Sequence, residues 1–353
     1  MPSPERGGAS ALDVLIVSLG STGGLRVADA QLAESMRRAG ASVSVAAPAS
    51  PSRRLRTLAL VDLAWARAVR RAAVLELARL RPRAVIYSST TAALLWPRVG
   101  AIRFDATSAG NRPGRHGLWQ RPVERLRLGE ASLLLPWSDA AMLEAPVSAR
   151  RGDRVLVLPV AVESSAPGPS AVRSASGPGA RDIAAVTYAA NPSKKGLDRV
   201  LAAWRRVRVD PEELVIAGVS AQELRRSGFL RAGEPGVRVV GPLETRDYRA
   251  LLRRARVFVC APRREDYGIA QLEALADGCL LVSTPAAGPY AALPIARALD
   301  PRLVADDLAV ALRCALDDPA AGYAEHALEA LLPFGREAVD RLVADELLPR
   351  LLA

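Results

Sequence analysis

The sequence predicts an α/β protein of two domains, each with a parallel β-sheet between layers of helices. Three observations support this. The chain has 353 residues, which is long for one domain. Short runs rich in Val, Ile and Leu alternate with helical patterns throughout, as is typical of parallel sheets. A stretch rich in Pro, Ser, Gly and Ala, residues 164–181, separates two such series.

The pattern also predicts the domain boundaries. We expect a Rossmann-like domain at 1–163, a linker or mobile loop at 164–181, a second Rossmann-like domain at 182–332 and a closing helix at 333–353. The strands expected in the first domain are 12–18, 43–46, 84–88, 101–105, 132–138 and 154–159, and its main helices are 27–39, 53–81, 91–95 and 119–130. The strands expected in the second domain are 182–189, 214–218, 237–242, 256–262 and 280–285.

The charge of the chain is unevenly distributed. The net charge is +11, and all of this excess lies in residues 1–160. A basic half of this kind favours an anionic partner, such as a phospholipid surface, a phosphorylated acceptor or nucleic acid. An Arg-rich solvated surface is the simpler alternative. The sequence contains neither a signal peptide nor a spanning segment, so we expect a cytoplasmic protein, with peripheral contact to the inner membrane face as an option.

The cysteines do not indicate a metal site. Cys260, Cys279 and Cys314 each lie among apolar residues and are expected in the core. The chain has no Asp-x-Asp motif and no cluster of histidines, so we expect no metal bound by the protein.

Residues 265–273 are the most informative stretch of the sequence. Glu265 and Glu273 are eight positions apart, the first after an apolar strand and the second one turn into a helix. A helix N-terminus favours an anionic group, and carboxylates beside it suit hydroxyl groups. This combination indicates a phosphorylated polyol such as a sugar nucleotide. The alternative is a solvated helix start with an acidic first turn.

The two lysines of the chain are neighbours. Lys194 and Lys195 stand in a loop after the first strand of the second domain, whereas every other basic residue is Arg. A compact ammonium kept at one place suggests that it holds a phosphate, with chance clustering as the alternative.

Two loops of the first domain are further candidates. Gly23 and Gly24 follow the first strand and would let the backbone approach a ligand, although a tight turn would also use glycine. This loop is not Gly-x-Gly-x-x-Gly, so a dinucleotide cofactor is not supported. The loop behind strand 101–105 supplies the polar candidates Asp105, Asn111, Arg112, Arg115 and His116. Asp105 and His116 are catalytic candidates. His116 could act as a base or bind an acceptor substrate, and the alternative is an ordinary surface histidine.

Three segments together resemble the retaining glycosyltransferases of family four, which have the GT-B fold. Residues 188–198 resemble the phosphate-site segment of that family, 239–243 its base-pocket turn, and 255–284 its Glu-x7-Glu core. The first half is similar only in layout. The resemblance implies two facing Rossmann-like domains with a central cleft, and a last helix that crosses back to the first domain.

The resemblance also implies a role for each residue of the donor site. Glu273 would bind the ribose, Glu265 the donor sugar, and Lys195, helped by Lys194, the leaving diphosphate. Gly268, Ile269 and Ala270 would offer backbone N–H groups to the diphosphate. Leu243 and its backbone would contact the base. The donor would be a UDP, GDP or ADP sugar, with no separate cofactor and no metal. The acceptor would be unknown, anionic or lipid-linked.

Two positions depart from the family pattern. Ala190 stands where the family often has Arg, and Tyr290 stands near a position that is often acidic. A catalytically weak homologue is therefore one alternative, and a GT-B-fold sugar-nucleotide epimerase is another. A nucleic-acid-binding protein is disfavoured, because the basic half lacks interleaved aromatic residues.

Overall fold

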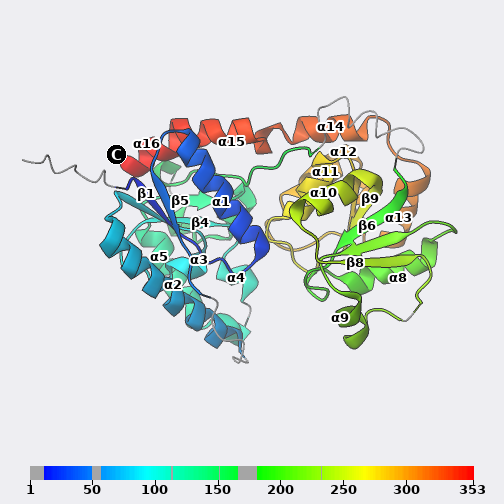
Figure 1. Ribbon diagram of the computed structural model, residues 1–353, viewed down its shortest axis with the longest axis horizontal. Helices are drawn as coiled ribbons and strands as arrows, with labels where there is room; N and C mark the ends of the chain where they lie inside the picture. Colours follow the sequence, from blue (N-terminus) through cyan, green and yellow to red (C-terminus); the bar gives the residue numbers. More distant parts are fainter. Residues whose placement is uncertain (1–11, 50–56, 113, 151, 166–180, 232) are drawn as a thin grey trace, which may run out of the picture. The chain divides into compact units, whose positions relative to one another are not determined.

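The computed structural model describes residues 12–49, 57–112, 114–150, 152–165, 181–231 and 233–353. These divide into two compact units (Figure 1). Unit 1 is Met1–Ala161 with Glu337–Ala353, and unit 2 is Val162–Arg336. Each unit contains a five-stranded sheet in which all neighbouring strands are parallel. The predicted fold class, α/β with two parallel-sheet domains, is confirmed. Most of the expected linker lies outside the described residues.

The sheet of unit 1 has the strand order β2-β1-β3-β4-β5. Its strands are β1 (Val14–Val17), β2 (Val43–Ala46), β3 (Ala84–Tyr87), β4 (Ala101–Phe104) and β5 (Leu134–Pro136). Every residue of β1, β3, β4 and β5 is buried, because helices cover both faces of the sheet.

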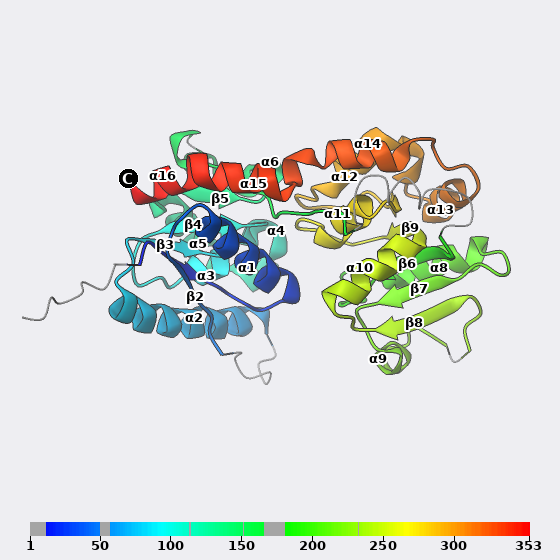
Figure 2. The same cartoon turned by 45° about the horizontal axis from the view of Figure 1, so that its top comes forward.

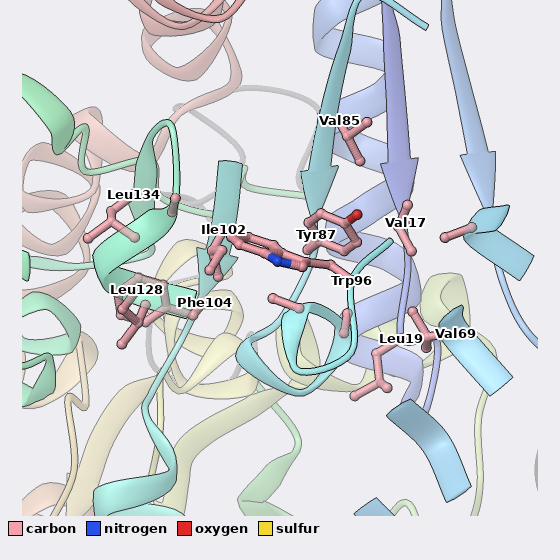
Figure 3. Packing of buried hydrophobic residues seen from close by; sticks show 14 of the residues in the cluster. Val17, Leu19, Val69, Val85, Tyr87, Trp96, Ile102, Phe104, Leu128 and Leu134 are labelled. Atoms are coloured by element: carbon pink, nitrogen blue, oxygen red, sulfur yellow. The ribbon is translucent and has the colours of Figure 1, made fainter. Parts of the chain in front are cut away.

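Two apolar clusters hold the helices of unit 1 to the sheet. α1 (Gly23–Arg38) contributes Leu32 and Met36 to one cluster. α2 (Leu58–Leu80) contributes Val69 to the other, where it lies near Val17 and Leu19 (Figure 3). The remaining helical segments in this part of the unit are α3 (Thr90–Ala93), α4 (Ser108–Asn111), η1 (Gly114–Gly117), α5 (Gln120–Glu130), α6 (Asp139–Glu144), η2 (Val147–Ala149) and η3 (Gly152–Arg154).

The C-terminal segment packs on the α1 side of unit 1. It consists of α15 (Arg336–Leu342), a π-helical turn at Val343–Leu347 and α16 (Leu348–Leu352). Val343 and Leu347 are buried in the cluster that contains Met36. Asp340 accepts hydrogen bonds from the Ser35 hydroxyl at 2.5 Å and from Arg38 at 2.7 Å. Proline cannot donate a helical hydrogen bond, so Pro349 explains why the single helix expected here contains a π-helical turn.

The sheet of unit 2 has the order β10-β9-β6-β7-β8. Its strands are β6 (Ile183–Tyr188), β7 (Leu214–Ala217), β8 (Val237–Gly241), β9 (Ala255–Cys260) and β10 (Leu280–Ser283). The crossover β6-α8-β7 runs one way along the sheet and β9-α11-β10 runs the other. Because such crossovers are right-handed, α8 (Leu197–Val207) and α11 (Ile269–Ala276) cover opposite faces (Figure 2). The other helices are α9 (Ala221–Arg226), α10 (Thr245–Arg254), α12 (Ala292–Leu299), α13 (Leu308–Asp317) and α14 (Tyr323–Ala330).

Three local expectations were wrong. Residues 154–159 form no strand, although an isolated bridge joins Val155 to β5 and the N–H groups of Leu156 and Leu158 donate to the carbonyls of Leu134 and Pro136. Pro136 in β5 lacks an N–H group, which limits the ladder there. α1 begins at Gly23 and not at residue 27, because the Thr22 hydroxyl accepts a hydrogen bond from the N–H of Leu25. Among the cysteines, Cys260 and Cys279 are buried as expected, whereas Cys314 is half-buried. No helix in the described ranges combines the length and apolarity needed to cross a bilayer.

Candidate active site

The candidate donor site lies where the strand order of unit 2 reverses. From β6 the chain runs outwards through β7 to β8, and then returns to β9 on the other side of β6. The loops that follow β6 and β9, residues 191–196 and 261–268, therefore leave neighbouring strands at the same edge of the sheet. In open α/β sheets, ligands bind at this switch point, outside the carboxyl ends of the strands.

The two loops are locked together through their backbones. The N–H of Arg263 donates to the carbonyl of Lys194 at 3.1 Å. Gly196 has φ +65°, and a Cβ added there would lie 1.8 Å from the carbonyl oxygen of Ala261. Only glycine permits this approach, so the position of Lys195 in the site depends on it.

Two ion pairs connect the loops at the same place. The Nζ of Lys195 lies 2.6 Å from Oε2 of Glu265, and the Nζ of Lys194 lies 2.8 Å from Oδ2 of Asp266. Arg264 also contacts Asp266, with 2.9 Å between Nε and Oδ1. Glu265 and Asp266 are both buried, so each carboxylate is held in a defined orientation. The expected meeting of the lysine pair with the 265–273 stretch is thus present in the structure.

The N-terminus of α11 opens directly behind these pairs. Gly268 caps the helix with φ +91°, and the first N–H groups of the helix, including those of Ile269 and Ala270, point out of its end. A Cβ added to Gly268 would lie 2.8 Å from the ring of Tyr290. Tyr290 is buried, with its hydroxyl 3.4 Å from Cys260 Sγ. It therefore packs beneath the turn and does not replace an exposed acid.

Gln271 is a site residue that the sequence analysis missed. Its Nε2 donates to Oε2 of Glu265 at 3.1 Å, so Glu265 is held from two sides, by an ammonium and by an amide. The side-chain oxygen of Gln271 is buried without a hydrogen-bond partner. No sequence signal pointed to it, because a glutamine six positions after a glutamate is unremarkable until a turn and a helix bring the two together.

Glu273 lies deeper along α11 in a mixed environment. Arg249 on α10 reaches it, with 3.8 Å between Nη1 and Oε1, and also binds Asp277 at 2.6 Å. Burial raises the pKa of Glu273 from 4.5 to about 7, against the attraction of Arg249 and with the help of repulsion from Asp277. The carboxyl group is therefore poised between its charged and neutral forms near neutral pH. Arg249 and Asp277 were not singled out from the sequence.

Leu243 lies further along the same edge. It is half-buried in the turn between β8 and α10. β8 is two strands away from β6, a distance of about 10 Å at the usual strand spacing. This separation suits a nucleotide whose diphosphate lies at the switch point and whose base lies near β8.

The remaining candidates belong to unit 1 and come from separate elements. Gly23 and Gly24 form the first turn of α1, where no chain atom lies close enough to require glycine at residue 23. The residue of this loop with a left-handed backbone is instead Gly20, at φ +61°. Asp105 follows β4 and is half-buried, whereas His116 is exposed in η1.

Two side chains in and near the loop behind β4 are engaged in contacts within unit 1. Arg112 forms a two-bond ion pair with Asp62 of α2, at 2.6 and 3.0 Å, so its guanidinium group is already engaged. The buried carboxyl group of Glu124 accepts hydrogen bonds from the N–H and hydroxyl of Ser108. Burial raises its pKa, although those hydrogen bonds oppose the shift. Glu124 was not singled out from the sequence.

This site agrees with a comparison against protein families. Residues 181–318 match the family Glycosyl transferases group 1. The match covers most of unit 2, including both loops of the site. No curated protein is significantly similar to the chain in sequence.

Solved structures of glycosyltransferases share the fold of the whole chain. Sucrose-phosphate synthase from Thermosynechococcus elongatus has a TM-score of 0.71 at 17% identity, over 95% of this chain and 98% of that one. WaaG, a glycosyltransferase of lipopolysaccharide biosynthesis, has 0.67 at 15%, over 94% and 99%. HepE from Anabaena, solved with UDP, has 0.64 at 14%, over 96% and 99%. The chain therefore has the GT-B fold, and the match to Glycosyl transferases group 1 lies within unit 2.

Proposed function

We propose that the protein is a retaining glycosyltransferase that moves a sugar from a nucleoside-diphosphate sugar to an anionic or lipid-linked acceptor. The ion pair between Lys195 and Glu265 carries this proposal. It joins the group proposed to face the diphosphate to the group proposed to face the sugar. The bond that breaks in glycosyl transfer lies between those two parts of the donor.

The proposed roles follow the charges that develop in the reaction. When the glycosyl–phosphate bond breaks, negative charge grows on the diphosphate. Lys195, Lys194 and the N-terminus of α11 would stabilise that charge. Because these groups supply positive charge, we propose that transfer needs no divalent metal. The carboxylate of Glu265 would hold sugar hydroxyls, and that of Glu273 the ribose hydroxyls.

The identity of the donor base is the first question to test. HepE has been solved with UDP and with UDP-glucose, which makes a uridine donor the first choice. Excess UDP, GDP and ADP should be compared for their effect on the melting temperature. At about 100 times its Kd, the correct nucleotide would add about 2.7 kcal/mol of stability, which for a chain of 353 residues raises Tm by about 4 °C. No shift with any nucleotide would contradict the proposal.

A sugar-nucleotide epimerase is the competing function. A UDP-N-acetylglucosamine 2-epimerase from Listeria monocytogenes shares the fold, with a TM-score of 0.59 at 12% identity, over 95% of each chain. The two reactions differ in their products, because transfer to an acceptor releases free nucleoside diphosphate. Turnover of a bound sugar nucleotide without such release would favour the epimerase.

A further inference from the structure

α2 presents two different faces, and only one of them contributes to the core. Ala66, Val69 and Ala73 recur at helical spacing and are almost completely buried. Val69 lies among the core residues in Figure 3. The opposite face lies along the margin of unit 1 (Figure 2).

That opposite face is both apolar and cationic. Its residues recur at helical spacing and are Leu60, Arg67, Arg71, Val74, Leu75 and Ala78. We call this set the outer stripe. Leu60 is 50% exposed and Leu75 is 70% exposed, values that are high for leucine.

The acidic residues of α2 lie outside the outer stripe. The helix has two, Asp62 and Glu76. Asp62 is buried and bound by Arg112, while Glu76 pairs with Arg79 of the same helix at 2.6 Å. The outer stripe therefore carries Arg67 and Arg71 without an acid among its own members.

The turn before α5 carries a second exposed group of apolar and cationic side chains. Trp119 donates from Nε1 to the carbonyl of Ala59 at 3.3 Å, which fixes this turn against the start of α2. Beside it, Leu118 is 66% exposed, and Arg115 and His116 are exposed as well. Arg115 and His116, two polar candidates from the sequence, thus lie beside the exposed Leu118. All three are near the N-terminal end of α2.

We propose that the outer stripe and residues 115–118 dock onto an anionic phospholipid surface. Exposed aliphatic side chains can enter the boundary between head groups and acyl chains, while guanidinium groups bind lipid phosphates. The +11 charge of the chain, all of it in residues 1–160, attracts the protein to such a surface. Nucleic acid would account for the arginines but not for the leucines, since bases stack on aromatic rings. This inference rests on the proposed function only where that function includes a lipid-linked acceptor.

Flotation of the full chain with lipid vesicles tests the proposal. The protein should bind vesicles in which about a third of the lipid is phosphatidylglycerol, and this binding should weaken as the salt concentration is raised. It should not bind vesicles of pure phosphatidylcholine. The double variant Leu75→Ser with Leu118→Ser should bind about tenfold more weakly, because it removes apolar contact without changing charge. Arg71→Glu should weaken binding to a similar extent.

Matched controls separate the surface from general effects. Leu332→Ser changes an equally exposed leucine of unit 2, and Arg297→Glu changes an exposed arginine of α12. Both should bind vesicles like the unchanged protein. An equal loss of vesicle binding in the variants and the controls would overturn the proposal. So would a protein that binds no vesicles, or one that instead binds random DNA in a salt-sensitive manner. The nucleotide shift of Tm, measured on the same preparations, reports on the donor site separately.

Discussion

Glu273 allows the donor site to be tested through pH. Burial raises its pKa from 4.5 to about 7, above its value in the unfolded chain. The folded protein therefore holds an extra proton between these values, and its stability falls as pH rises through about 4.5 to 7. Above that window the buried carboxylate lowers the free energy of unfolding by about 3 kcal/mol, at about 1.4 kcal/mol for each pKa unit.

The variant Glu273→Gln removes this cost while keeping the shape of the side chain. It should be more stable than the unchanged protein by about 3 kcal/mol near pH 8, but by only about 1.4 kcal/mol near pH 5.5. Urea unfolding at both pH values measures the difference. The same variant should bind nucleotide more weakly at about pH 8, because a neutral amide is a poorer acceptor for ribose hydroxyls than a carboxylate.

Glu329→Gln is the matched control, because Glu329 is an exposed glutamate on α14. Its effect on stability should be small at both pH values. If Glu273→Gln gave the same advantage at both pH values, the reasoning about burial would be refuted. Unchanged nucleotide affinity would count instead against the ribose contact.

Three further predictions concern the loops of the site. Gly196→Ala should destabilise the protein well beyond Gly228→Ala in urea unfolding. Both positions have positive φ, at a cost of about 1–2 kcal/mol for alanine, but only residue 196 meets a backbone carbonyl. Lys195→Ala should lower kcat about 100-fold with a smaller change in KM, and unchanged kcat in steady-state kinetics would exclude a role in stabilising the leaving group. Gln271→Leu should lower kcat/KM about tenfold at nearly unchanged Tm, because Glu265 keeps only one of its two partners.

The sheets were predictable because both are parallel and covered on two faces. Their strands are then short apolar runs, which stand out in a sequence whose other segments are rich in Arg and Ala. The errors in element boundaries occurred where a single residue determines the local backbone hydrogen bonding. A threonine cap started α1 early, and Pro136 limited pairing after β5. The π-helical turn before Pro349 has the same kind of local cause.

The arrangement of the candidate donor site was predictable only in part. Glu265, Glu273 and the lysine pair could be found because their spacing, or their rarity, is visible along the chain. Gln271 and Arg249 could not, because each matters through a carboxylate that folding brings near. Gly196 is the clearest case. Residue 196 must lack a Cβ because the carbonyl group of Ala261, which is 65 positions away in the chain, lies against it.

The C-terminal segment has a consequence for the order of synthesis. The core of unit 1 uses Val343 and Leu347, which leave the ribosome only after all of unit 2. Until then, the patch around Leu32 and Met36 is uncovered in the nascent chain, which makes it a candidate for chaperone binding. A circular permutant with residues 337–353 placed before residue 12 would let unit 1 close before unit 2 is made, and should aggregate less during synthesis.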